Sequence, residues 1–302
     1  MKFAEKYFEQ VKLLLEVIPF VAKEKCFALK GGTAINMFFQ DLPRLSVDLD
    51  LVYLPIEERE KSYENINSAL KRIADNLLNL GYEAVLQGKN EKKILVFTQK
   101  ATVKIEPNYT IRGCLSEPVF ISVVPKVQEV FGYAKMNVLE KEELYAGKFC
   151  AALDRQHPRD LFDVMQLFEN EIEFSEKFIH CFIVYALGHN RPLHELVDCT
   201  IKDNSKIFEK EFVGMTDVYV SYDNLISTLK KLKEELKKRI IPYKEKLLDF
   251  VKLNADFSFL PYKNVAELPA IKWKLKNLEK LALTDKEKFD LQYEELKKYL
   301  ES

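Results

Sequence analysis

Two short stretches near the start of the chain decide the fold: Leu29-Lys30-Gly31-Gly32-Thr33-Ala34 and Arg44-Leu45-Ser46-Val47-Asp48-Leu49-Asp50-Leu51. The apolar residues 27–29 predict a short strand that leads into the glycines, and residues 34–39 predict a short helix after them. In the second stretch, polar residues 46, 48 and 50 alternate with apolar residues 47, 49 and 51, which predicts a strand with one polar and one apolar face. A strand, glycine turn, helix and strand in this order indicate mixed α+β structure.

The two aspartates of the second stretch, Asp48 and Asp50, are candidate metal ligands. Residues i and i+2 of a strand point to the same face, so both carboxylates project side by side. Two like charges at that spacing are costly, and Mg²⁺ relieves the cost because it binds one or two carboxylates together with substrate phosphates. A solvated edge strand can carry the same pair, but the apolar flanks place this one at a core boundary.

Two further features of the first half extend the candidate site. Glu106 ends a predicted strand over residues 102–105, where a third carboxylate would complete a two-metal site, although a single glutamate at a strand end is by default a surface residue. Gly31 and Gly32 let backbone N–H groups approach a phosphate without an obstructing Cβ, and the helix start after them favours an anion. An ordinary strand-to-helix turn would show the same two glycines.

The chain has 302 residues, which suits two domains of ordinary size. With only 9 Gly and 11 Pro, an all-β sandwich or barrel is disfavoured. The periodicity of the first half predicts α+β structure, whereas the second half is almost entirely helical, with a long helix expected over residues 222–253. We therefore predict an α+β domain over residues 1–130 and an all-helical domain over residues 131–302.

The overall charge is close to zero, since 46 Lys and Arg stand against 47 Asp and Glu. This balance argues against a uniformly basic nucleic-acid binder but allows a local basic face. Residues 230–239 are rich in lysine and form either a solvated helix face or a contact to RNA phosphates. Residues 272–276 add a basic cluster around the sole Trp, which is either part core and part surface or a further contact to RNA. Five scattered cysteines without a CxxC pair, no signal peptide and no apolar run of membrane-spanning length predict a soluble cytoplasmic protein.

The order of these parts resembles the DNA-polymerase-β-like nucleotidyltransferase superfamily. The resemblance implies a catalytic first domain, in which helices flank a mixed sheet, and an all-helical second domain that completes the nucleotide pocket and binds the acceptor. More narrowly, the two stretches quoted above look like those of the AbiEii/AbiGii toxin family of nucleotidyltransferases. In the second half, residues 142–155 followed by residues 159–164 are similar to the family's helical stretch, in which a lysine on one helix and an aspartate opening the next face the nucleotide pocket. The resemblance covers roughly residues 27–165, and it implies that Lys148 contacts the triphosphate and that Asp160 orients Lys148 or the nucleotide.

The resemblance also implies a reaction, in which Mg²⁺ supports transfer of NMP from an NTP to an acceptor hydroxyl in a cleft between the two domains. Asp48 and Asp50 would hold metal, while Glu106, a glutamate where the family pattern has aspartate, would ligate a second ion and help to activate the acceptor. The remaining expected roles concern the phosphates and the loop before the metal strand: Gly31, Gly32 and Thr33 would hold the β- and γ-phosphates, and Arg44 and Ser46 would order the loop.

The biological role implied by the resemblance is the toxin of a type IV toxin–antitoxin, or abortive infection, system with a cognate antitoxin. The favoured acceptor is the 3′ end of tRNA or another RNA. Two alternatives stay open: a small-molecule, antibiotic-type nucleotidyltransferase with the same metal site, and a catalytically inactive nucleotide-binding regulatory module. The intact pair of aspartates argues against the inactive module.

Overall fold

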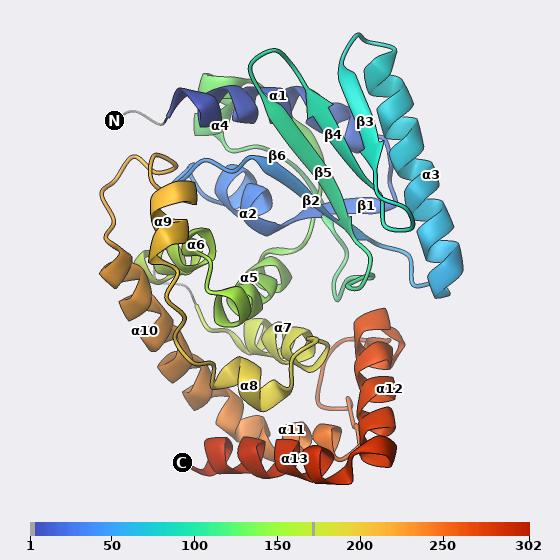
Figure 1. Cartoon of the computed structure of the whole chain (residues 1–302), viewed down its shortest axis with the longest axis vertical. Helices are drawn as coiled ribbons and strands as arrows, with labels where there is room; N and C mark the ends of the chain where they lie inside the picture. The colour runs from blue at the N-terminus through green and yellow to red at the C-terminus, as the bar shows by residue number, and fades with distance from the viewer. Residues whose placement is uncertain (1–3, 171–172) are drawn as a thin grey trace. The chain divides into compact units, whose positions relative to one another are not determined.

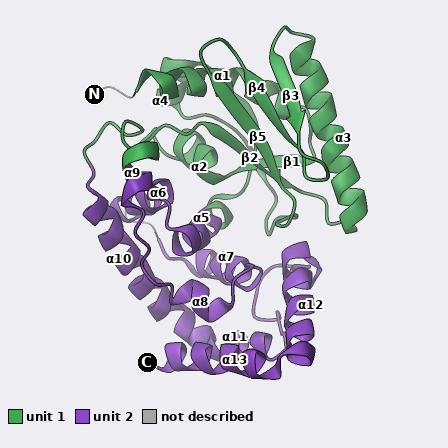
Figure 2. Cartoon of the chain, viewed as in Figure 1, with its two compact units in different colours: residues 1–144, 209–219 green, residues 145–208, 220–302 purple. Residues whose placement is uncertain are grey.

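The structure is a computed structural model that describes residues 4–170 and 173–302 (Figure 1). The chain divides into two compact units (Figure 2). Unit 1 consists of Met1–Leu144 and Glu209–Tyr219, and unit 2 of Tyr145–Phe208 and Val220–Ser302. The units therefore part later in the chain than the boundary predicted near residue 130, and unit 1 includes a segment from the second half.

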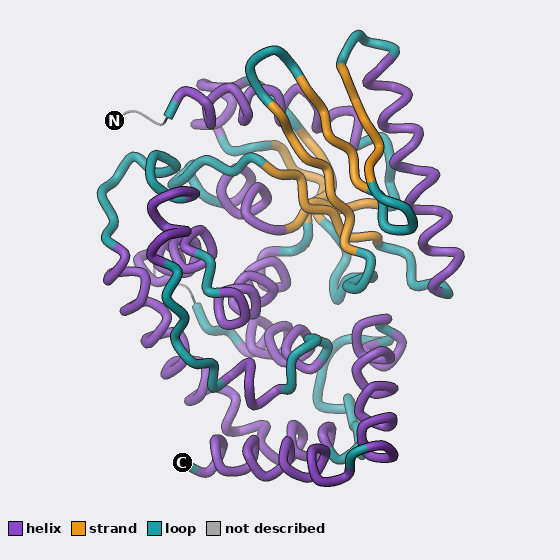
Figure 3. Tube along the Cα trace, in the orientation of Figure 1, coloured by secondary structure: helices purple, strands orange, loops and turns teal. Residues whose placement is uncertain are grey.

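Unit 1 contains every strand of the described residues (Figure 3). The strands are β1 (Phe27–Lys30), β2 (Asp48–Tyr53), β3 (Glu83–Gln87), β4 (Lys93–Phe97), β5 (Thr102–Asn108), β6 (Val119–Ser122) and β7 (Lys135–Val138). Its helices are α1 (Glu5–Val21), α2 (Gly31–Ala34), the π-helix η1 (Ile35–Phe39), α3 (Arg59–Leu78) and α4 (Pro125–Phe131). The predicted mixed sheet with flanking helices is thereby confirmed.

The strands form one mixed sheet in the order β3-β4-β5-β2-β1-β7-β6. At its centre β2 pairs antiparallel with β1 and parallel with β5. Leu49 and Leu51 of β2 are completely buried, whereas Asp48 and Asp50 are only half-buried, as the alternation of the sequence predicts. α1 contacts β5 and β7, and α3 contacts β3 and β4. The central strand thus presents its apolar side chains to the core and its aspartates to the opposite face of the sheet.

Unit 2 is helical throughout its described residues (Figure 3). Its helices are α5 (Lys141–Arg155, which begins in unit 1), α6 (Pro158–Glu169), α7 (Glu176–Leu187), α8 (Leu193–Val197), α9 (Ser205–Glu211, which ends in unit 1), α10 (Tyr222–Ile240), η2 (Ile241–Tyr243), α11 (Lys244–Val251), η3 (Val265–Glu267), α12 (Pro269–Thr284) and α13 (Lys286–Glu301). α10 packs on α6, α7 and α8, and α13 packs on α8, α11 and α12. The phenylalanines 149, 162, 178 and 182 lie in the core of this unit, each at most 1% exposed.

Two prolines place helix boundaries differently from the sequence analysis. The single helix expected over residues 222–253 is wrong: α10 ends at Ile240, and the 3₁₀ turn that contains Pro242 separates it from α11. Proline lacks the N–H that an uninterrupted helix would use there. Conversely, the helical spacing of apolar residues from Phe3 to Ile18 predicts a helix that ends near Pro19, but α1 continues past Pro19 to Val21. Residue 3 lies outside the described residues.

Candidate active site

The glycine turn, formed by Gly31 and Gly32 where β1 leads directly into α2, leaves little room for a side chain at either position. Gly31 has a positive φ of 74°, and a Cβ at this position would lie 2.6 Å from Asp50 Oδ2. A Cβ on Gly32 would overlap the guanidinium of Arg44 and lie 3.1 Å from Ser46 Oγ. The two glycines therefore let the turn approach the aspartate strand and the loop before it more closely than any other residue would allow.

Thr33 connects the glycine turn to β2 through a hydrogen bond. Its side chain is buried, and its hydroxyl donates to the carbonyl oxygen of Asp48 at 2.5 Å and lies 3.0 Å from the Ser46 hydroxyl. The bond fixes the backbone of Asp48, which carries one of the two candidate metal ligands. Thr33 thus has a structural contact in place, while its expected contact to a phosphate stays a prediction.

Arg44 is buried beside the glycine turn, with 2% of its surface exposed. One guanidinium nitrogen donates to the carbonyl oxygen of Leu45 at 2.9 Å, and another is the atom that a Cβ on Gly32 would strike. The guanidinium therefore lies directly against the turn, where it is in a position to order the loop before β2.

A segment from the second half of the chain, residues 212–216, braces the same loop. Arg44 forms an antiparallel bridge with Thr216, and the Leu45 N–H donates to the carbonyl oxygen of Met215 at 2.8 Å. The Thr216 hydroxyl donates to the carbonyl oxygen of Pro43 at 3.3 Å, and the side chain of Met215 is buried. Sequence reasoning missed this contact, because no local pattern connects residues so far apart in the chain.

The three predicted carboxylates lie on the paired strands β2 and β5 and point to the same face of the sheet. Asp50 on β2 is the register partner of Glu106 on β5, and Asp48 is the partner of Lys104. Paired residues of neighbouring strands point to the same side of a sheet. The structure therefore places Glu106 beside the aspartates, together with a lysine to which the sequence analysis gave no role.

Lys104 already engages the third carboxylate: its Nζ lies 2.6 Å from Glu106 Oε2. Burial lowers the pKa of Lys104, but Glu106, Asp48 and Asp50 outweigh it and raise that pKa above its ordinary value. Among residues 4–170 and 173–302, no three His, Cys, Asp or Glu side chains are grouped so as to hold a metal ion. The aspartate pair suits Mg²⁺, which prefers carboxylate oxygens, whereas the place of Glu106 in a two-metal site stays a prediction.

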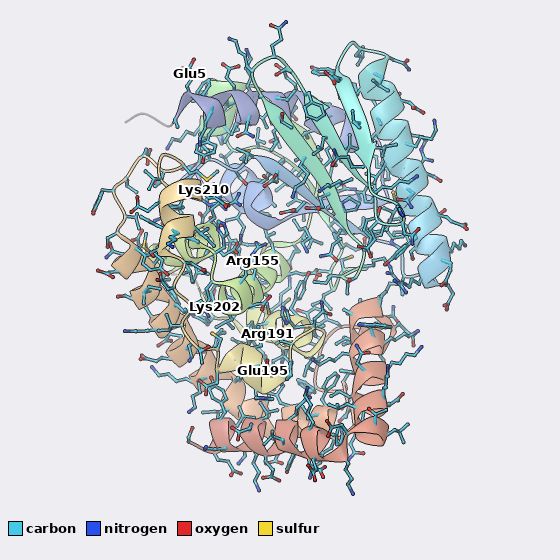
Figure 4. All side chains as sticks on the ribbon, in the orientation of Figure 1. Glu5, Arg155, Arg191, Glu195, Lys202 and Lys210 are labelled. Atoms are coloured by element: carbon cyan, nitrogen blue, oxygen red, sulfur yellow. The ribbon has the colours of Figure 1, made fainter. Side chains whose placement is uncertain are left out.

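The predicted residues of the second half form a buried ionic cluster within unit 2. Lys148 Nζ on α5 lies 2.6 Å from Asp160 Oδ1 and 2.9 Å from Asp163 Oδ2 on α6, and all three side chains are at most 4% exposed. Arg155, labelled in Figure 4, donates to Asp160 from Nε at 2.5 Å. The positive charges of Lys148 and Arg155 thus lie against the negative charges of two carboxylates, those of residues 160 and 163, within unit 2.

Burial alone would raise the pKa of Asp160, but the adjacent Lys148 and Arg155 hold it well below its usual range. The structure therefore brings the predicted Lys148 and Asp160 into contact, as the alternative in which Asp160 orients Lys148 requires. Sequence reasoning missed Asp163 and Arg155. The available signal was spacing, since residues 160 and 163 share a helix face, as do residues 148 and 155.

The lysine clusters of unit 2 are only partly on the surface. In the first cluster, Lys233 pairs with Asp198 at 3.0 Å, and Lys238 pairs with Glu235 at 3.1 Å. In the second, Lys274 is buried and donates to the carbonyl oxygens of His189 and Arg191, and burial lowers its pKa to about 8. Intramolecular contacts thus occupy several of these lysines, and a contact to RNA stays a prediction.

Comparisons with known proteins bear on this fold and on these residues. The family model described as "Nucleotidyl transferase AbiEii toxin, Type IV TA system" matches residues 12–249. Among solved structures, MenT4, a nucleotidyltransferase toxin from Mycobacterium tuberculosis H37Rv, is similar with a TM-score of 0.58 and 14% identity over 77% of this chain and 85% of that one. At this identity the likeness shows the fold.

Two other comparisons add no argument. A solved structure described as "tRNA-processing enzyme (apo form I)" has 13% identity over 97% of this chain and 98% of that one, but its TM-score is only 0.23. A search of curated proteins finds no significant match.

In the described part of the chain, no helix is both long and apolar enough to cross a membrane.

The family match covers most of the chain and includes the glycine turn, both aspartates, Glu106, Lys148 and Asp160. The chain therefore belongs to the AbiEii family of nucleotidyltransferase toxins, and it is an enzyme that transfers nucleotidyl groups from a nucleoside triphosphate.

Proposed function

We propose that this toxin transfers NMP from an NTP to a hydroxyl at the 3′ end of tRNA, in an Mg²⁺-dependent reaction, as part of a type IV toxin–antitoxin system. The observation that carries the proposal is the pair of aspartates on one face of β2, against which the Gly31 turn is closely packed. Family membership supports the reaction class, and the acceptor is the part most in need of a test.

Each site residue has a stated task in this proposal. Asp48 and Asp50, with Glu106 as third ligand, would hold the divalent ion, which when bound neutralises phosphate charge and lowers the pKa of an attacking hydroxyl. Gly31 and Gly32 would hold the β- and γ-phosphates through their backbone N–H groups, as the family resemblance implies. Thr33 and Arg44 keep this turn and the aspartate strand in a fixed relation.

Lys148 is the expected cation for the triphosphate, and its setting in unit 2 bears on that task. Two carboxylates share its charge, so its ammonium is oriented before any ligand arrives. Asp160 is therefore a positioning residue for Lys148, rather than a group that must itself touch the nucleotide. Preorganised charge of this kind stabilises a reacting anion without reorganisation during the reaction.

The acceptor can be identified by incubating the purified chain with Mg²⁺, total tRNA and each α-³²P-labelled NTP in turn. Label should appear on tRNA and should be absent from tRNA whose 3′-terminal diol has been oxidised with periodate. Label on oxidised tRNA would exclude the 3′ end as acceptor. Label on a small aminoglycoside-type acceptor but not on RNA would favour the antibiotic-type alternative.

The toxin role needs a cellular test. Expression of the wild-type chain should arrest growth, and co-expression of the neighbouring gene should relieve the arrest. The Asp48→Asn variant should be harmless, whereas Asp41→Asn, a change at an exposed aspartate before β2, should be as toxic as the wild type. Toxicity of Asp48→Asn equal to that of the wild type would contradict the site assignment.

A further inference from the structure

Lys104 is a residue of the active-site face whose chemistry the proposed function does not use. It projects from β5 on the same side of the sheet as the three carboxylates, because it pairs in register with Asp48 and lies two residues before Glu106. Its ammonium lies 2.6 Å from Glu106, and the two side chains are 31% and 41% exposed. The Lys104 ammonium therefore already contacts Glu106, the carboxylate that is expected to be the third metal ligand.

The charges on this face favour a cation beside Glu106. Asp48, Asp50 and Glu106 together carry three negative charges on adjacent strands, and like charges at this spacing repel. Lys104 offsets part of this repulsion. On β1, which pairs with the opposite edge of β2, Lys30 is the register partner of Asp50. A free divalent ion would have to compete with the Lys104 ammonium for Glu106.

A divalent ion that arrives bound to a nucleotide encounters a different set of charges on this face. The triphosphate brings its own negative charge, which offers the ammonium a new partner when Glu106 turns to the metal. An ion pair that is partly exposed to water is weak, so exchanging its partner costs little. The same lysine thus disfavours a bare ion and tolerates an ion that arrives with NTP.

We propose that Lys104 is a positioning residue that couples metal binding to nucleotide binding, by holding Glu106 until the divalent ion arrives together with the NTP. This inference rests on the proposed metal site at Asp48 and Asp50. It assigns to the chain a preference for the metal–nucleotide complex over the free ion, and it names the side chain responsible.

The test measures binding of Mn²⁺ to the full chain by electron paramagnetic resonance, with and without a non-hydrolysable NTP analogue. Lys104→Met should bind free Mn²⁺ about tenfold more tightly than the wild type, because the substitution removes a neighbouring like charge whose repulsion of a divalent ion in a water-like medium is of about that size. The gain in Mn²⁺ affinity caused by the analogue should shrink by a similar factor.

Two variants serve as matched controls. Lys104→Arg keeps the charge and should behave like the wild type, and so should Lys100→Met, which removes an exposed lysine from the turn between β4 and β5. Circular dichroism establishes that each variant is folded, and Lys104→Gln is the replacement if the methionine variant is not. Equal Mn²⁺ affinity for Lys104→Met and the wild type, or weaker binding by the variant, would overturn the inference.

Asp48→Asn separates this inference from the proposed function. If Asp48→Asn abolishes Mn²⁺ binding while Lys104→Met leaves it unchanged, the metal site stands and the role of Lys104 fails. If Asp48→Asn leaves Mn²⁺ binding unchanged, the metal site itself is wrong and both proposals fall. Loss of binding in Asp48→Asn together with tighter binding in Lys104→Met supports both.

Discussion

Replacing Asp160 with asparagine tests the physical account of the buried cluster in unit 2. The carboxylate is 2% exposed and contacts Lys148, itself 4% exposed, at 2.6 Å. Removing one partner of a buried ion pair costs about 3–5 kcal/mol, because it leaves a charge without compensation. Asp163 still contacts Lys148 at 2.9 Å in the variant, so we expect the lower end, about 3 kcal/mol.

Arg155 provides the internal comparison. Its side chain is 62% exposed, so its pairing with Asp160 is screened by water and contributes about 0–1 kcal/mol. Arg155→Met should therefore lower the free energy of unfolding by less than about 1 kcal/mol, although it contacts the same carboxylate. Asp154→Asn is a control on α5, because its carboxylate is 35% exposed and contacts Arg191 Nη1 at 3.5 Å and the imidazole of His189 at 3.6 Å.

The assay is urea unfolding followed by tryptophan fluorescence. The chain has one tryptophan, Trp273 on α12, and it lies in unit 2 with the cluster, so its signal reports the unfolding of that unit. A loss of less than about 1 kcal/mol in Asp160→Asn would refute the assignment of a buried charge pair. A loss in Arg155→Met as large as that in Asp160→Asn would refute the argument from exposure.

The stability difference between the wild type and Asp160→Asn should change with pH in a defined direction. Because the pKa of Asp160 is lower in the folded chain than in the unfolded chain, where it is about 3.9, the carboxylate stabilises the fold above that value. The contribution is lost as the pH falls below the unfolded pKa towards the folded one. The difference in stability between wild type and Asp160→Asn should therefore be constant from pH 7 to about pH 5 and shrink below about pH 4.

Three predictions concern the glycine turn and the loop beside it. Gly32→Ala should reduce stability by about 1–3 kcal/mol and weaken NTP binding, because the new methyl group displaces Arg44, and an unchanged KM for NTP would contradict this. Thr33→Val should cost about 1–3 kcal/mol and lower kcat, because it removes the bond to the Asp48 carbonyl, and a kcat equal to wild type would count against that anchor. Met215→Ala should destabilise unit 1 by about 2–5 kcal/mol in a thermal melt and reduce activity, and full activity at full stability would show that the bracing segment is dispensable.

The local parts of the site could be predicted from the sequence because they follow from strand and turn geometry. The alternation around Asp48 and Asp50 fixed which face of β2 is polar, and the two glycines marked the turn that packs against it. The family resemblance then supplied Lys148 and Asp160, which the structure brings into contact.

The remaining features depend on contacts that no local pattern contains. The pairing of Leu45 with Met215 links residues from opposite halves of the chain, and the short strand β7 shows its place only through its pairing with β1 and β6. The position of Lys104 could have been noticed from the sequence, since it alternates with Val103 and Ile105 on the strand that carries Glu106. That strand continues to Asn108, so its predicted end at Glu106 is wrong. The importance of Lys104 becomes visible only when the register puts it opposite Asp48.

Nucleotidyl transfer at Asp48 and Asp50 can be tested by following which phosphate of the NTP reaches the RNA. The chain is incubated with tRNA, Mg²⁺ and an NTP that carries ³²P at either the α- or the γ-phosphate. The account predicts that only the α-label reaches the RNA, and that Asp48→Asn slows this transfer more than about a hundredfold, which corresponds to a loss of about 3 kcal/mol of transition-state stabilisation. Transfer of the γ-label, or transfer of the α-label by Asp48→Asn at the wild-type rate, would contradict it.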